Sequence, residues 1–258
     1  MLVMPQSRRV CRSSAALVVA MWLLALAGCG SPGQAERTLN VSAASSLRST
    51  FEELAQLFRA ENPGVTVALN FAGSSELAQQ IVNGSPADVF AAASPATMRT
   101  VTDAGLAQNP QVFVTNQLQI ATAPGNPKGI ATFADLARPD LKAVVCAPQV
   151  PCGAATEEIE KATGVTLAPV SEEPDVKSTL GKVTTGNADA GLVYVTDVID
   201  AEGAVQGVPF PEARNAINDY PIVVLRDAPN AELAAKFVEL VRGADARLVF
   251  QAAGFGIP

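Results

Sequence analysis

Short apolar runs alternate with segments of helical periodicity along most of the chain. The first such pair is a strand over residues 38–43 and a helix in which Leu47, Phe51, Leu54 and Phe58 share one face. Further strands are predicted over residues 65–71, 88–93, 143–146 and 190–195, and further helices over residues 77–81, 154–163, 176–183, 231–242 and 246–252, with one more opening at Ser94-Pro95. This alternation predicts an α/β architecture with mainly parallel strands.

Two long apolar segments interrupt the alternation and predict a division into two lobes. Residues 111–123 and 220–225 each read as a strand, and they stand where the chain would leave one lobe and return to it. The expected lobes are residues 38–117 plus 223–258, and residues 118–222. Two α/β lobes joined by two crossing strands would enclose a cleft, which is the expected ligand site.

The amino-terminal segment reads as an export signal. Arg8, Arg9 and Arg12 precede an apolar stretch over residues 15–27, which is too short for a spanning helix. The stretch ends in Leu26-Ala27-Gly28-Cys29, which resembles a bacterial lipobox in which Cys29 carries the lipid. We therefore predict a signal peptide over residues 1–28 and a tether over residues 29–37. The alternative is an ordinary signal peptide with an incidental cysteine.

Charge and composition narrow the possible functions. The 258 residues carry a formal net charge of -7 and contain no His. The negative charge argues against binding to nucleic acid or to an anionic lipid surface, and the lack of His excludes a Ser-His-Asp triad. Once the signal is removed and Cys29 is lipidated, Cys146 and Cys152 remain. An even pair in an exported chain predicts a disulfide, with two free buried thiols as the alternative.

The candidate chemistry lies in turns that precede predicted helices. These turns are Ser45-Ser46, Gly73-Ser74-Ser75, Pro151-Cys152-Gly153 and Glu173-Pro174-Asp175-Val176. A helix start offers unpaired N–H groups and a partial positive charge, and Ser adds a hydroxyl donor. Several such starts facing one cleft would surround a tetrahedral oxyanion with uncharged donors. Taken singly, each Ser is better explained as a helix cap than as a ligand contact.

Seven short motifs, in order along residues 38–258, resemble those of the ModA family of molybdate-binding proteins. They are VSAASSL (41–47), FAGSS (71–75), PADVF (86–90), VPCG (150–153), EPDV (173–176), ADAGLVY (188–194) and AGF (253–255). The resemblance implies a two-lobed periplasmic binding protein fold of type II. It also implies that an oxyanion is held by the hydroxyls and amides of Ser46 and Ser74, the backbone N–H groups of Cys152 and Val176, and the hydroxyl of Tyr194.

The chain departs from the family pattern at two positions. Cys152 stands where the family usually has Ala, which a backbone contact tolerates. Gly73 replaces a more typical Ser and is expected to loosen its loop. Asp88, Asp189 and Asp197 lie near strand ends, where we expect them to act as caps and structural partners, because a carboxylate facing an oxyanion would repel it.

The resemblance implies a solute-binding protein that captures molybdate, and also tungstate, for an ABC importer. We expect a monomer at the extracytoplasmic face of the bacterial cell membrane, held by its lipid and contacting the importer's permease, with no cofactor, no directly bound metal and no enzyme activity. Sulfate, phosphate or another tetrahedral oxyanion is the alternative ligand. An exported serine hydrolase is the alternative of another class, but it would lack a base. An iron carrier is disfavoured because Tyr194 and Tyr220 are the only tyrosines.

Overall fold

Two five-stranded sheets form the framework of the computed structural model, which describes residues 37–258. In the first sheet the strands lie in the order β2 (Val65–Ala72), β1 (Arg37–Ala44), β3 (Val89–Ala91), β10 (Asn218–Val224) and β4 (Gln111–Asn116). In the second they lie in the order β7 (Ser171–Glu173), β6 (Ala143–Cys146), β8 (Ala190–Tyr194), β5 (Leu118–Thr122) and β9 (Gln206–Val208). The α/β class predicted from the alternation is confirmed.

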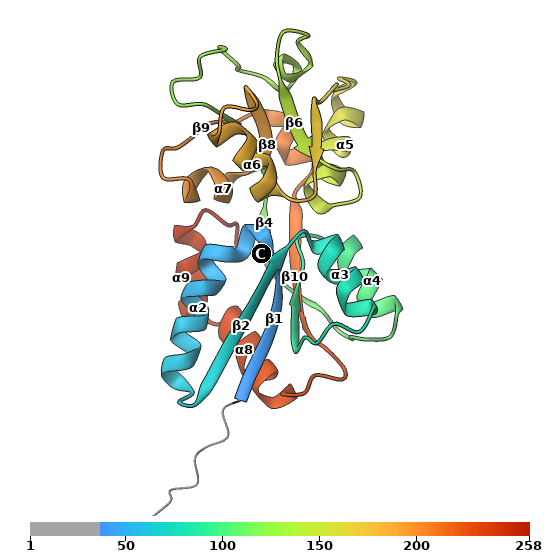
Figure 1. Cartoon of the computed structure of the whole chain (residues 1–258), viewed down its shortest axis with the longest axis vertical. Coiled ribbons are helices and arrows are strands. Elements are labelled where there is room, and N and C mark those ends of the chain that lie inside the picture. Colours follow the sequence, from blue (N-terminus) through green and yellow to red (C-terminus); the bar gives the residue numbers. More distant parts are fainter. Residues whose placement is uncertain (1–36) are drawn as a thin grey trace, which may run out of the picture. The chain divides into compact units, whose positions relative to one another are not determined.

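Helices cover both faces of each sheet (Figure 1). Around the first sheet lie α2 (Arg48–Glu61), α8 (Ala231–Arg242) and α9 (Ala244–Ala252) on one side, and α3 (Ser74–Val82) and α4 (Pro95–Asp103) on the other. The second sheet is flanked by α5 (Pro151–Thr163) on one side and by α6 (Val176–Thr184) and α7 (Val195–Asp200) on the other. Short 3-10 turns are η1 (Ser45–Leu47), η2 (Phe133–Ala137) and η3 (Pro211–Asn215).

Both sheets are mixed, but four of the five strands in each run in one direction, so the expectation of mainly parallel strands is confirmed. In the first sheet β1 pairs in parallel with β2 and β3, but β10 runs antiparallel to β3 and β4. In the second, β6 pairs in parallel with β7 and β8, but β5 runs antiparallel to β8 and β9. Periodicity reports which residues are buried and says nothing of strand direction, which depends on distant partners.

The two sheets are joined where a single strand was predicted over residues 111–123. This segment is β4 and β5, which belong to different sheets and are separated by Gln117 alone. The return segment is β10, which pairs with β3 and β4 of the first sheet. The expected boundary at residues 222/223 therefore falls inside β10.

Aromatic side chains fill the core between the first sheet and its helices. Phe51 of α2 packs against Phe113 of β4 and against Phe237 of α8, with ring centroids 6.1 and 5.9 Å apart. Phe250 of α9 joins this group at 5.3 Å from Phe113. Each of the three helices contributes one of these rings from its buried face, so burying them together fixes α2, α8 and α9 against the sheet.

The start of α4 agrees with the cap expected from the sequence, but α5 begins earlier than expected. Ser94 caps α4 by accepting a hydrogen bond from the Thr97 N–H at 3.2 Å. However, α5 begins at Pro151, three residues before the predicted start at Ala154. Pro is favoured at the first helical position because it has no N–H to lose and its φ is already helical. Cys152 therefore lies inside the first turn of a helix.

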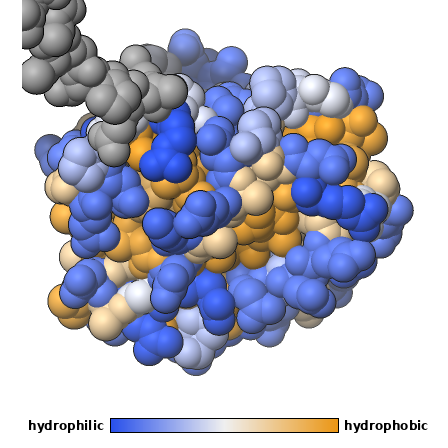
Figure 2. Space-filling view, turned by 90° about the horizontal axis from the view of Figure 1, so that it is seen from below, coloured by the Kyte–Doolittle hydropathy of each residue, from blue (hydrophilic) through white to orange (hydrophobic). Residues whose placement is uncertain are grey.

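Exposed apolar side chains do not gather into one area on the face seen from below in Figure 1. Figure 2 shows hydrophobic patches there interspersed with hydrophilic residues. Within residues 37–258 no helix is both long and apolar enough to cross a membrane. The predicted signal peptide, nearly all of the tether and Cys29 lie outside the described residues.

Candidate functional site

All five residues predicted to contact the ligand line one pocket. Ser46, Ser74, Cys152, Val176 and Tyr194 are each between 1% and 7% exposed and border the same cavity. They follow or end five parallel-paired strands, namely β1, β2, β6, β7 and β8. Carboxyl ends of parallel strands meet at one edge of a sheet, and the two sheets turn these edges toward each other.

The donors from the first sheet are serine hydroxyls and the amides beside them. Ser46 lies in η1, directly after β1, and its Oγ shares a hydrogen bond of 2.9 Å with the Tyr220 hydroxyl. Ser74 is the first residue of α3, and its Oγ accepts a hydrogen bond from the Ala93 N–H at 3.0 Å. Because the Ser74 oxygen accepts there, its hydroxyl hydrogen is free to donate into the pocket.

The donors from the second sheet are backbone N–H groups at two helix starts. Pro151 opens α5 without an N–H, so Cys152 supplies the first donor of that helix. Val176 opens α6, and the first N–H groups of a helix have no intrahelical acceptor. Both helices also direct the positive ends of their dipoles at the pocket.

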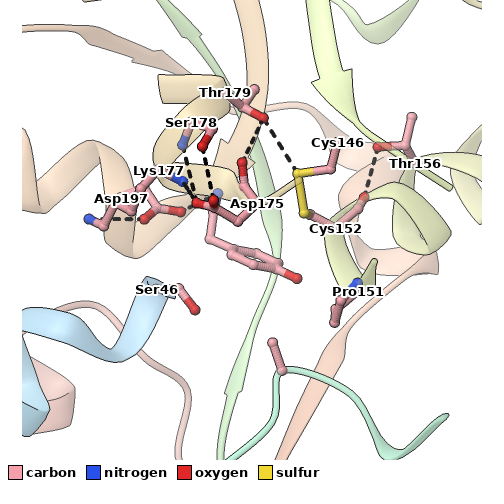
Figure 3. The surroundings of a disulfide bond; sticks show 12 residues. Ser46, Cys146, Pro151, Cys152, Thr156, Asp175, Lys177, Ser178, Thr179 and Asp197 are labelled. Carbon is pink, nitrogen blue, oxygen red and sulfur yellow. Dashed lines mark hydrogen bonds and ion pairs between the residues drawn. A yellow bond between two sulfur atoms is a disulfide. The ribbon is translucent and has the colours of Figure 1, made fainter. Parts of the chain in front are cut away.

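One carboxylate, that of Asp175, belongs to a residue lining the pocket. Its Oδ1 accepts hydrogen bonds from the N–H groups of Lys177 and Ser178 at 2.8 and 3.2 Å, and its Oδ2 accepts one from the Ser178 hydroxyl at 2.9 Å. The side chain is thus the cap of α6 and is turned into that helix (Figure 3). Because the Asp175 carboxylate bonds the next two N–H groups, the Val176 N–H stays available to a ligand.

Two buried tyrosines meet at the base of the pocket, with ring centroids 6.0 Å apart. Burial raises the pKa of Tyr194 well above its usual value, and the neighbouring Tyr220 and Asp197 raise it further. Burial likewise raises the pKa of Tyr220. Both hydroxyls therefore keep their protons and can donate. Among the described residues the buried Tyr194 hydroxyl has no hydrogen-bond partner of ordinary length, which is rare and leaves it free to donate to a group in the pocket.

A disulfide joins Cys146, at the end of β6, to Cys152, with Cα atoms 5.7 Å apart (Figure 3). It closes the short loop that carries Pro151 into the pocket wall. Gly153 lies beside it, and a Cβ there would stand 1.9 Å from the Ala147 carbonyl oxygen. The loop is therefore packed against the first turn of α5, and both features fix the position of the Cys152 N–H.

Gly73 faces the second sheet closely. A Cβ on Gly73 would lie 2.4 Å from the carbonyl oxygen of Pro174. The sequence led us to expect a loosened loop at Gly73, whereas the structure shows that glycine lets the segments before α3 and α6 approach each other. The same edge carries a direct hydrogen bond, in which the Ser75 hydroxyl donates to the Gln149 carbonyl at 2.7 Å.

Sequence reasoning did not place Tyr220 and Asn218 at the site. Tyr220 bonds Ser46, while the Asn218 amide donates to the Ala93 carbonyl at 3.0 Å and to the Pro151 carbonyl at 3.4 Å. Asn218 therefore bridges the two walls behind the pocket. The sequence carried one signal for this residue. Asn218 is the first residue of β10 and stands two positions before Tyr220, one of only two tyrosines in the chain.

The pocket is small and uncharged apart from the capped Asp175. The open space between the donors is about what one water molecule needs, so a bound anion of several atoms would require the walls to stand slightly further apart. Among the described residues that line it, none is Lys or Arg. No cluster of metal-ligating side chains occurs within residues 37–258. Converging hydroxyl and amide donors around so small a space fit a compact anion.

Comparisons with known proteins agree with this geometry. A family model described as "Bacterial extracellular solute-binding protein" matches residues 39–256. The chain is 49% identical to the molybdate-binding protein ModA of Mycobacterium tuberculosis (strain H37Rv) over 255 residues, which covers 95% of this chain and 98% of that protein.

Two solved structures share the fold. The periplasmic molybdate-binding protein of Azotobacter vinelandii matches with a TM-score of 0.73 and 23% identity, covering 85% of this chain and 99% of that one. The sulfate-binding protein SubI of Mycobacterium tuberculosis matches with a TM-score of 0.76 and 17% identity, covering 85% and 86%. At these identities the likeness concerns the fold alone.

Proposed function

Because the chain belongs to the bacterial extracellular solute-binding proteins, and among them to the ModA family, we propose that it captures molybdate outside the cytoplasm for an ABC importer. It is a binding protein and not an enzyme. Molybdate is its ligand and no cofactor is needed. We propose tungstate as a second ligand, since it is a tetrahedral dianion of similar size.

The single observation that carries the proposal is the convergence of Ser46, Ser74, Cys152, Val176 and Tyr194 on one small cavity. These residues lie far apart in the chain and come from both sheets. Each offers a hydroxyl or amide donor, and the Tyr194 hydroxyl makes no hydrogen bond of ordinary length to the described residues. A dianion that replaces the missing partners would satisfy groups whose burial otherwise costs free energy.

Calorimetry with molybdate, tungstate and sulfate tests the proposal on protein lacking residues 1–29. We expect one molybdate or tungstate ion to bind per chain, and sulfate to bind far more weakly. Sulfate is smaller, so it would leave some buried donors unpaired, at about 1–3 kcal/mol each. Ser46→Ala and Ser74→Ala should each weaken binding while the protein stays folded. If both variants bind as the wild type does, the assigned site is wrong.

Sulfate is the strongest competing ligand. The likeness to SubI in fold favours keeping it in the comparison, and the same donors suit any tetrahedral oxyanion. If sulfate binds as tightly as molybdate, the ligand has to be reassigned, while the same residues still form the site.

We further propose that the two sheets are the cores of two lobes that close on the anion. The first would comprise residues 38–117 and the carboxyl-terminal segment, and the second the residues between β5 and β10. Gln117 and the segment just before Asn218 would be the hinges. Closure would complete the donor shell, exclude water and present a surface to the permease. A lipid on Cys29 would hold this monomer at the membrane, and the mass of the amino-terminal peptide from native membranes tests it.

The disulfide gives a separate prediction. In a Cys146→Ala/Cys152→Ala variant we expect the free energy of unfolding to fall by about 2 kcal/mol, because the unfolded chain is no longer constrained. Molybdate affinity should fall less than tenfold, since the backbone donor at position 152 is kept. Urea unfolding and calorimetry measure both, with the intact mass of the wild type reporting oxidation. An unchanged urea midpoint would contradict the prediction.

A further inference from the structure

A chain of polar contacts links the two sheets outside the pocket. The Ser49 hydroxyl on α2, which packs on the first sheet, donates a short hydrogen bond to Asp200 Oδ1 at the end of α7, which belongs to the second. The other Asp200 oxygen contacts Lys177 Nζ at 2.6 Å. We call Ser49, Asp200 and Lys177 the Ser49 latch.

Further polar contacts connect the Ser49 latch to residues that line the anion pocket. Lys177 Nζ also pairs with Asp197 Oδ1 at 3.1 Å, and Asp197 is fully buried. Asp197 Oδ2 accepts a hydrogen bond from the Tyr194 N–H at 3.0 Å. Lys177 follows Val176, which lines the pocket. Figure 3 shows Asp175, Lys177 and Asp197 grouped above Ser46, which enters from the other side.

The charged groups of the latch and the neighbouring Asp197 stabilise one another. Burial raises the pKa of Asp197, although Lys177 opposes this effect. Burial would lower the pKa of Lys177, but Asp197 and Asp200 outweigh it and raise the pKa. The Lys177 ammonium group thus pairs with two carboxylates, the buried one of Asp197 and the exposed one of Asp200. Among the described residues of this chain of contacts, only Ser49 lies on an element that packs against the first sheet.

We propose that the Ser49 latch is a positioning device that holds the two lobes closed and slows release of the bound anion. The inference rests on the proposed function, because it requires lobes that open and close around a ligand. When the lobes separate, Ser49 and Asp200 part and each is hydrated, while the Lys177–Asp197 pair stays within the second lobe. The latch therefore contributes only to the closed form.

The test is a stopped-flow measurement of molybdate association and dissociation on protein lacking residues 1–29. For Ser49→Ala we expect dissociation about three- to tenfold faster, which is the range for one hydrogen bond, and unchanged association. Ser49→Thr keeps a hydroxyl and should restore slow release. Ser85→Ala, an exposed serine in the loop before β3 at the opposite end of that strand from the pocket, is the matched control and should leave both rates unchanged.

A double-variant cycle separates the latch from general effects on the fold. Ser49→Ala combined with Asp200→Ala should release molybdate no faster than Asp200→Ala alone, because the two residues share one contact. Gly73→Ala serves as a positive control for closure, because its Cβ would meet Pro174 and should speed release by another route.

The outcomes are distinguishable. If the wild type binds molybdate and Gly73→Ala speeds release, but Ser49→Ala releases at the wild-type rate, the latch is overturned and the proposed function stands. Additive effects of Ser49→Ala and Asp200→Ala would also overturn it. If the wild type binds none of the anions, the proposed function fails, and the latch fails with it.

Discussion

Removing the Tyr194 hydroxyl is expected to weaken molybdate binding by about 10- to 150-fold while leaving the empty protein as stable as the wild type. A hydrogen bond to a charged group contributes about 1.5–3 kcal/mol, which corresponds to that range. The hydroxyl is buried and keeps its proton, and among the described residues it makes no hydrogen bond of ordinary length, so Tyr194→Phe removes no such bond from the empty protein. Calorimetry gives the affinity, and thermal unfolding without ligand gives the stability.

Tyr220→Phe is the matched control for this prediction. Its hydroxyl is also buried, but it already bonds Ser46 at 2.9 Å. We therefore expect Tyr220→Phe to lower the stability of the empty protein by about 1 kcal/mol. A Tyr194→Phe variant that binds molybdate as tightly as the wild type would show that the Tyr194 hydroxyl does not touch the anion.

Adding one methyl group at Gly153 is expected to have the largest effect on stability. The Cβ of Gly153→Ala would lie 1.9 Å from the Ala147 carbonyl oxygen and 2.4 Å from its carbon, both of them backbone atoms that a disulfide-closed loop holds in place. We expect a loss of about 3 kcal/mol or more in the free energy of unfolding, measured by urea. Displacement of the Cys152 N–H should also weaken molybdate binding.

Gly181→Ala controls for the general effect of replacing a helical glycine. Gly181 lies within α6, and a Cβ there meets nothing within 4 Å. Ala has the higher helix propensity, so this variant should gain up to about 1 kcal/mol. Equal stabilities of the two variants would mean that the loop at Ala147 moves aside freely.

The sequence allowed the candidate site to be predicted better than the sheets around it. Turns such as Ser45-Ser46 and Pro151-Cys152-Gly153 are local features, and the strand before each one can be read from adjacent residues. Because carboxyl ends of parallel strands share an edge, the turns at residues 46 and 74 could be expected to meet, whereas the approach of residue 152 from the second sheet could be expected only from the two-lobed fold. Their contact with an anion stays a prediction.

Long-range pairing could not be read in the same way. Residues 111–123 read as one strand because apolar positions occur on both sides of the short polar run at residues 115–117, yet Gln117 in that run separates strands of different sheets. The direction of β10 depends on β3 and β4, more than 100 residues earlier in the chain. The bond between Ser46 and Tyr220 is equally remote in sequence, so hydroxyl partners of this kind appear only once the fold is known.

None of the described residues that line the pocket is lysine or arginine, and this affects how the anion can be released. A salt bridge in a buried site must be pulled apart when its anion departs, which would strand an unpaired charge in the interior. Hydroxyl and amide groups leave no such charge behind and simply rehydrate as the walls separate. A neutral lining thus allows tight capture without making delivery to the membrane electrostatically uphill.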